Sequence, residues 1–478
     1  MPLNRFPARF LLLVMFWLVP ATSRFDQAFA HASDRGHVML LPTGYYLLGG
    51  AIAVALSFVV LFFVDPRSLD RLARVRATVF RPPVDGKLVS SSVSFLVLAG
   101  LVAAGFQGSR DPLSNPLPLV VWTVLWVGIV LLQGVAGNLW RWINPWYGPW
   151  RLFVLAAGRG TDRWLDYPKA LSLWPAFVGL SLLAWFELIY PAPDDPARLA
   201  AVVAVYWAAT FVLMVLFGFD RWSRDGEFLT VFMGMISRIG MLATQRLPGS
   251  AELRLNLPGA RLADQPSLPI AGTAFLLLAL ASVSFDGLMR TFVWLGLVGI
   301  NPLEFPGRSA VMKANTVGLW TTFCVLGAVF LLAVAAGERL AGRRASALEA
   351  AGALVWSIMP IALAYHFSHY LTSLLVNGQY ALSAISDPFA NGLNLFGTAR
   401  HHVSAGAVLG AESAWVIWNL QATAIIAGHV LAVVSAHLIA WRRHGSARLA
   451  TISQLPLAVL MVAYTVFGLW LLSTPTGY

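Results

Sequence analysis

Long apolar runs separated by short polar segments dominate this chain. A helix rises 1.5 Å per residue, so about 20 apolar residues cross the roughly 30 Å core of a bilayer. The runs that meet this length lie near residues 43–64, 90–107, 117–137, 170–190, 197–218, 269–285, 316–336, 350–374, 413–440 and 455–473. The pattern predicts an all-α fold, a polytopic transmembrane helix bundle of about ten spans.

The first thirty residues have a different pattern. Arg5 and Arg9 precede an apolar stretch that is too short to span a bilayer, and Ala28-Phe29-Ala30 follows it as a small-x-small cleavage pattern. We therefore expect residues 1–30 to be a cleaved signal peptide, with an uncleaved anchor as the alternative. Residues 31–478 then form a single transmembrane helical domain.

The charged residues of the loops predict an orientation. A secretory signal places residue 31 outside, so the loop at residues 65–89, which is rich in Arg, should lie inside. In the ten-span interpretation three further basic loops lie on the same side, at residues 138–169, 337–349 and 441–449. This agrees with the positive-inside rule. The sequence therefore predicts a bacterial inner membrane protein with the mature N-terminus and the C-terminus on the periplasmic side.

One apolar segment, residues 226–245, does not fit a simple span. It contains Glu227 and Arg238, and a span here would move the basic 246–268 loop to the outside. We interpret it as an interfacial or re-entrant helix.

Two other segments lie between the predicted spans. Residues 138–158 are rich in Trp and Arg, and Asn144-Pro145-Trp146 should break them into two short helices. The longest predicted outer loop is 377–412.

Composition supports the membrane interpretation. Of the 478 residues, 58% are hydrophobic and only 12% are charged, whereas soluble domains have about 25% charged residues. The net charge of +11 comes from Arg residues in short loops, where they meet lipid head groups rather than nucleic acid. The predicted partner is the lipid bilayer. The single cysteine, Cys324, excludes a disulfide framework.

Ionisable residues inside the membrane are the candidate site, because their burial is costly. His366 and His369 are three residues apart and so share one helix face, and His429 lies in the next span. Asp286 lies at the outer end of an earlier span. We expect the three histidines to bind a divalent transition metal, zinc or copper, with Asp286 as a carboxylate that lines the same outer-facing cavity.

Other interpretations of these residues stay open. The histidines could form a hydrogen-bonded polar network between helices, or ligate haem. Arg290 follows Asp286 by four residues and could pair with it, which would weaken Asp286 as a ligand. Glu187, near the outer end of its span, is expected to reach water.

A second metal site is predicted at the mature N-terminus. Cleavage after Ala30 would expose the α-amine and the ring of His31, and His37 would add a second imidazole. Such a nitrogen set suits copper. The alternative is cleavage elsewhere, with both histidines solvated.

Several stretches of the mature chain stand in a recognisable order. They are His31, Asn144-Pro145-Trp146, Gly226–Phe232, Ser284-Phe285-Asp286-Gly287, Pro360–Tyr370, Gly428-His429-Val430 and Tyr464–Trp470. With them the chain resembles a family of bacterial polytopic membrane proteins labelled fenitrothion hydrolase. The resemblance assigns no catalytic residues.

The resemblance implies a membrane-bound hydrolase of organophosphate esters, phosphotriesters and phosphorothioates such as fenitrothion, with an apolar small-molecule substrate. In the chemistry that this function requires, a metal would polarise the phosphoryl group and activate water, and Asp286 would act as the catalytic base. Two alternatives stay open: a periplasm-facing protein that binds or transports copper or a similar transition metal, and a non-catalytic membrane subunit that supports a partner subunit.

Overall fold

The computed structural model describes residues 43–80, 86–158, 163–247, 250–304, 307–342, 347–404, 411–474 and 476. The predicted signal peptide, His31 and His37 lie outside these residues.

Long apolar helices confirm the predicted all-α polytopic bundle. Within the described residues, nine helices are long and apolar enough to cross a membrane, and a tenth, α9 (Trp174–Leu188), is apolar but shorter. The nine are α2 (Thr43–Phe63), α4 (Lys87–Gln107), the continuous run of α5 (Pro116–Pro118), η2 (Leu119–Ile129) and α6 (Val130–Ala136), α10 (Pro196–Phe217), α13 (Ile270–Met289), α15 (Arg308–Leu340), the run from α16 (Ala347–Leu354) through η6 (Val355–Ile358) to α17 (Met359–Ser386), α19 (Ala411–His444) and α20 (Ala447–Ser473). Each overlaps one of the predicted spans.

Short helices fill the connections. They are α3 (Pro66–Ala73), α7 (Trp140–Ile143), α8 (Tyr147–Ala156), η3 (Lys169–Leu171), α11 (Phe219–Asp225), α12 (Phe228–Ile236), η4 (Leu262–Asp264), α14 (Phe292–Leu297) and η5 (Pro302–Glu304). The predicted break at Asn144-Pro145-Trp146 is confirmed, because α7 ends at Ile143 and α8 begins at Tyr147.

Two predicted boundaries need correction. Only Phe228–Ile236 of the 226–245 segment is helical, and a β-strand begins at Leu242. The predicted outer loop 377–412 is too long, because α17 continues to Ser386. Buried Ala381, Ala384 and Ser386 pack this last part of α17 against its neighbours, and polar residues such as Asn377 and Gln379 had concealed its helical pattern.

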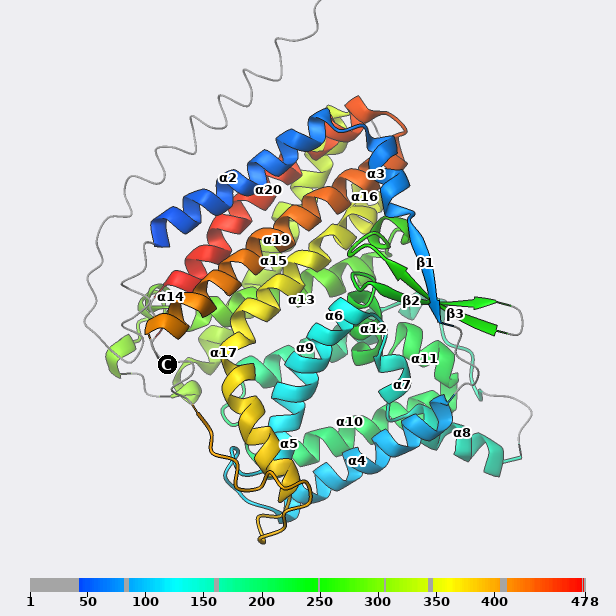
Figure 1. Cartoon of the computed structure of the whole chain (residues 1–478), viewed down its shortest axis with the longest axis vertical. Coiled ribbons are helices and arrows are strands. Elements are labelled where there is room, and N and C mark those ends of the chain that lie inside the picture. Colours follow the sequence, from blue (N-terminus) through cyan, green and yellow to red (C-terminus); the bar gives the residue numbers. More distant parts are fainter. Residues whose placement is uncertain are drawn as a thin grey trace, which may run out of the picture. The chain divides into compact units, whose positions relative to one another are not determined.

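A three-stranded antiparallel sheet, which the sequence did not predict, joins two distant loops. Its order is β1 (Arg76–Phe80), β3 (Ser250–Asn256), β2 (Leu242–Leu247), with Arg76 opposite Asn256 and Leu242 opposite Leu255. The end of the bundle at which this sheet lies is called the sheet side below (Figure 1).

Ion pairs tie further loops to the sheet side. Arg442, at the end of α19, contacts Asp70 of α3 and Asp264 at 2.8 and 2.6 Å. Next to it, Arg443 reaches Glu338 at the end of α15, at 3.8 Å. Described residues of three of the predicted basic loops, those at 65–89, 337–349 and 441–449, therefore meet on one side of the bundle. On the opposite side, Thr291 pairs with Thr476.

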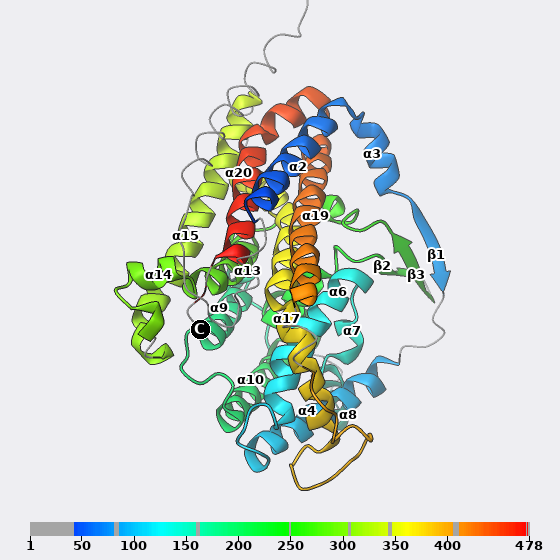
Figure 2. The same ribbon diagram turned by 60° about the vertical axis from the view of Figure 1, so that its left-hand side comes forward.

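Close helix packing places α17 at the centre of the bundle, between α19, α13 and η2 (Figure 2). A Cβ on Gly428 of α19 would lie 2.5 Å from the Cβ of Ala364. On α20, a Cβ at Gly468 would lie 1.3 Å from the Tyr365 hydroxyl. Small residues let these helices approach. This packing holds the polar face of α17 inside the protein.

Candidate functional site

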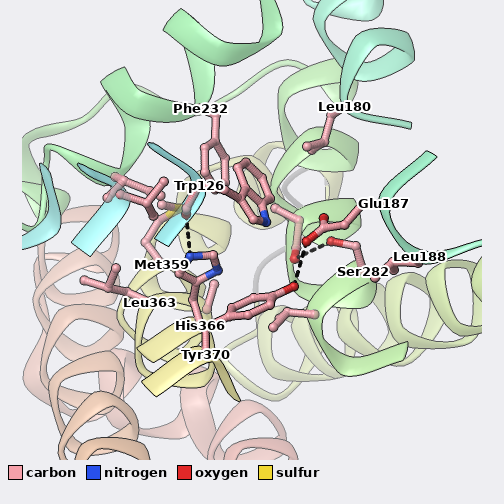
Figure 3. Close-up of a pocket in the computed structure, with 15 residues that line it drawn as sticks. Trp126, Leu180, Glu187, Leu188, Phe232, Ser282, Met359, Leu363, His366 and Tyr370 are labelled. Atoms are coloured by element: carbon pink, nitrogen blue, oxygen red, sulfur yellow. Dashed lines mark hydrogen bonds between the residues drawn. The ribbon is translucent and has the colours of Figure 1, made fainter. Parts of the chain in front are cut away.

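A small cavity lies among α9, η2, α12, α13 and α17 (Figure 3). The cavity has a volume of about 30 Å³, which is enough for roughly two waters. Most of its lining is apolar. The polar side chains in the lining are Trp126, Glu187, Ser282, His366 and Tyr370. A mostly apolar pocket with a few convergent polar groups is the usual form of a binding site.

The Tyr370 hydroxyl joins two carboxyl groups from different helices. It lies 2.8 Å from Glu187 Oε1 and 3.0 Å from Asp286 Oδ2. A phenol has one proton and can donate it once. One of the two carboxyl groups must therefore carry a proton and donate it to the Tyr370 oxygen.

Asp286 is the carboxyl group that stays ionised. It is fully buried. Its Oδ1 accepts a hydrogen bond from Arg290 Nη2 at 2.9 Å, and its Oδ2 lies 2.6 Å from His369 Nε2. A carboxylate held by a guanidinium and an imidazole N–H is strongly stabilised as the anion. The shared proton therefore belongs to Glu187, and the chain of contacts runs from Glu187 through Tyr370 and Asp286 to His369.

His366 presents a lone pair toward the cavity. Its Nε2 lies 2.7 Å from the Trp126 carbonyl oxygen, which can only accept, so Nε2 carries the ring proton. In the neutral imidazole the other nitrogen, Nδ1, is then an acceptor, and it is turned toward the cavity (Figure 3). The ring packs against Tyr370, with ring centroids 4.9 Å apart.

Trp126 contributes both its carbonyl and its indole. It lies in η2, a stretch of π-helix, which is rare in proteins and frequent at functional sites. Its ring stacks on Phe232 at 5.3 Å and meets the edge of His366 at 5.6 Å. The indole N–H points toward Glu187 but is buried without a hydrogen-bond acceptor among the described residues (Figure 3).

His429 lies apart from this cavity. Its Nδ1 donates to the Ile425 carbonyl at 2.8 Å, and its ring packs near Tyr365 and Tyr464, at centroid distances of 6.2 and 6.1 Å. Its Nε2 is buried and has no partner among the described residues. The Tyr464 hydroxyl instead hydrogen-bonds Ser284 of α13.

The predicted three-histidine metal site is therefore not formed. Residues three apart on a helix point about 60° apart, so His366 faces η2 while His369 faces Asp286 of α13. His429 meets the neighbouring face of α17, at Tyr365. Within the described part of the chain, no three His, Cys, Asp or Glu side chains converge as metal ligands. The residues do not fit the expected metal, and no step below uses one.

The expected pairing of Arg290 with Asp286 is confirmed, and this salt bridge makes Asp286 an anchor rather than a free base. Neither Trp126 nor Tyr370 was predicted as a site residue. Glu187 was expected to reach water, but it lines the cavity instead. One signal was available: Tyr370 follows His366 by four residues and so shares its helix face.

A second polar cluster explains two of the sequence stretches singled out above. Glu227 accepts hydrogen bonds from the backbone N–H groups of Leu229 and Thr230, both at 2.7 Å, and so caps the start of α12. The Thr230 hydroxyl accepts from Asn144 Nδ2 at 3.1 Å. Gly226–Phe232 and Asn144-Pro145-Trp146 therefore pack on each other as structural elements.

Comparison with known proteins adds no relatives. A scan against protein-family models, a search of curated proteins and a search of solved structures each found no match to this chain.

Proposed function

We propose that the chain is a membrane-embedded hydrolase of neutral, apolar esters, with organophosphate triesters as the class to test. One observation carries this proposal. The hydrogen bond between Glu187 and Tyr370 lies at the wall of a cavity toward which the lone pair of His366 also points. A hydrolase needs a proton donor, here Glu187, and a proton acceptor, here His366, at the same cavity.

The two groups have complementary roles in ester cleavage. His366 Nδ1 takes a proton from water as the water oxygen forms a bond to phosphorus. The bond from phosphorus to the aryl oxygen breaks, and the Glu187 proton passes to that oxygen. Return of the proton from His366 to Glu187 by way of water in the cavity restores the site, and the acidic product loses its proton to solvent.

Asp286 and His369 hold this machinery in place. Asp286 accepts from Tyr370, and Arg290 keeps it charged. The cavity has room for about two waters, so an aryl ester requires the apolar side chains of Met359, Leu363 and Phe232 to move. An apolar substrate would reach them by partition into the bilayer.

The membrane and the orientation also belong to this proposal. The basic loops gathered on the sheet side support a cytoplasmic sheet side in a bacterial inner membrane. Both termini then lie in the periplasm, and Asp286, near the end of α13 away from the sheet, lies toward the periplasmic side.

Purified protein tests the proposal through release of nitrophenol from fenitrothion or its phosphate analogue. Replacement of His366 by Ala should lower the turnover by about 10²–10⁴-fold, the usual contribution of a general base. The control is His402→Ala, which removes an exposed histidine of the loop after α17 and should leave turnover unchanged. Equal turnover in both variants, or none in the wild type, would reject the hydrolase.

A second candidate is proton-linked transport of an apolar solute. The observation that favours it is the chain from Glu187 to His369, whose side chain is 21% exposed, because intramembrane carboxylates and histidines often relay protons. Protein in liposomes that carry a pH-sensitive dye would then acidify the lumen on addition of solute, without ester cleavage.

A further inference from the structure

The indole N–H of Trp126 lies at the cavity wall and has no hydrogen-bond acceptor among the described residues. A buried donor without a partner costs roughly 1–3 kcal/mol, so its presence beside a cavity calls for an acceptor inside the cavity. The atom is buried, and no described residue accepts from it. Glu187 lies in its direction and attracts the N–H, but the two groups do not meet the geometry of a hydrogen bond.

The charges at the cavity determine what kind of acceptor fits. Among the described residues, Glu187 is the one carboxylic acid in the lining, and no Lys or Arg lines the cavity. The nearest cation on this chain of contacts, Arg290, is held by Asp286 at 2.9 Å. An anion would therefore enter a space with no counter-charge, at high desolvation cost. An uncharged ligand oxygen meets no such penalty.

We propose that Trp126 Nε1–H binds the uncharged phosphoryl or carbonyl oxygen of a neutral ligand, and that the cavity rejects the corresponding anion. This assignment rests on the proposed function for the substrate, because it orients the ester with its oxygen on Trp126 and its reacting centre between His366 and Glu187. Trp126 is then the group that stabilises charge on that oxygen as water attacks.

The position of Trp126 suits this role. Its ring stacks on Phe232 and makes an edge contact with the His366 ring. Its backbone carbonyl accepts a hydrogen bond from the same histidine. A donor held rigid in this way needs no rearrangement as charge develops. Trp126, which would bind the oxygen, and His366, which would act as the base, are therefore held next to each other by a hydrogen bond.

Binding can be measured without any turnover. In ¹⁵N-labelled protein, the indole signal of Trp126 is identified as the one lost in Trp126→Phe, which keeps an aromatic ring and removes the N–H. Trimethyl phosphate, which is neutral, should shift this signal downfield. Dimethyl phosphate, an anion of nearly the same size, should leave it in place at the same concentration.

Turnover gives a second, independent measurement. Oxygen is a much better hydrogen-bond acceptor than sulfur, so Trp126→Phe should lower kcat/KM for a P=O ester by roughly tenfold or more. The value for the matching P=S ester should change by less than about threefold. The control is Trp418→Phe, because the Trp418 indole N–H is also buried with no partner in the part of the chain that the structure describes, but Trp418 does not line the cavity. It should affect both esters equally.

The outcomes separate this proposal from the proposed function. A Trp126 signal that ignores trimethyl phosphate, or that shifts equally with dimethyl phosphate, overturns the assignment of Trp126, and so does an equal loss for the P=O and P=S esters. If wild-type protein cleaves neither ester but trimethyl phosphate still shifts the Trp126 signal, the hydrolase fails and the binding site stands.

Discussion

Two glutamates inside this bundle, Glu187 and Glu227, have similar sequence surroundings and opposite structural roles. Each lies in an apolar segment, and each carboxyl group contacts a tyrosine hydroxyl, Tyr370 for Glu187 and Tyr206 for Glu227. Glu227 is 1% exposed, and each of its oxygens accepts a backbone N–H at the start of α12. Glu187 has no such backbone donors in the hydrogen bonds of the described residues and lines a cavity.

The difference shows how partners decide the role of a buried acid. Backbone N–H groups can only donate, so a carboxylate that accepts several of them is held as an anion and works as a helix cap. A carboxyl group that shares one proton with a phenol, beside a space for water, is free to give that proton away.

Replacement of Glu187 by Gln should greatly lower ester turnover and leave the stability of the fold nearly unchanged. The amide still hydrogen-bonds Tyr370 but cannot deliver a proton, so ester turnover should fall by about 10²–10⁴-fold. The melting temperature in detergent, measured by thermal unfolding, should stay within a few degrees of the wild type. Full turnover in this variant would show that Glu187 is as structural as Glu227.

Replacement of Asp286 by Asn should destabilise the protein strongly. It leaves Arg290 and His369 without their anion, and breaking a buried pair from one side costs about 3–5 kcal/mol. The free energy of unfolding, measured with chemical denaturant, should fall by that amount. The double variant Asp286→Asn with Arg290→Gln removes the unpaired cation and should recover part of the loss; no recovery would contradict the pairing as the cause.

Replacement of Glu227 by Ala should destabilise the protein without changing its chemistry. Loss of a helix cap costs about 0.5–2 kcal/mol, and the buried Tyr206 hydroxyl loses its acceptor as well. We expect a lower melting temperature and unchanged turnover per folded molecule. The variant Glu227→Gln keeps one acceptor and should lie between Ala and the wild type. A large loss of turnover in folded protein would place Glu227 in the reaction.

The charges on the sheet side should affect stability only, and weakly. Burial raises the pKa of Asp70, but the hydrogen bonds from Arg74 and Arg442 together lower it by more. The pKa of Asp70 therefore lies below its ordinary value. A depressed folded pKa stabilises the protein above about pH 4, and this contribution disappears as the pH falls through the folded pKa. Asp70→Asn should therefore lower stability at pH 6 by less than about 1 kcal/mol, with no difference from the wild type at strongly acid pH.

That last comparison is read from acid-unfolding curves of the two proteins, with turnover as the control. Turnover per folded molecule should be the same in both at pH 6. A larger stability gap at acid pH than at pH 6 would reverse the sign of the argument, because the pair would then contribute most when Asp70 is protonated.

The spans could be predicted because they depend on local properties of the chain. Twenty apolar residues in lipid have one way to satisfy their backbone groups, so α2, α4 and α20 follow from hydropathy alone. Pro145 likewise predicts the break between α7 and α8. The sheet could not be predicted in the same way, because β1 and β3 lie about 175 positions apart in sequence and only the tertiary fold brings them together.

The candidate site was predicted in part. Ionisable residues in apolar runs pointed to His366, His369 and Asp286, and the spacing of Arg290 indicated its pairing with Asp286. Trp126 and Tyr370 carry no such signal, since Trp and Tyr are common in membrane helices and most of them only pack.

Hydropathy along the chain is enough to specify a bundle of membrane helices and the ionisable groups that the bilayer must hide. How these groups are partnered depends on the tertiary structure. His429 turns toward Tyr365 and Tyr464 instead of joining His366, while Glu187 meets Tyr370 across two helices. Helix periodicity gives the face of each side chain, but the rotation of one helix against the next comes from close packing at residues such as Gly428 and Gly468.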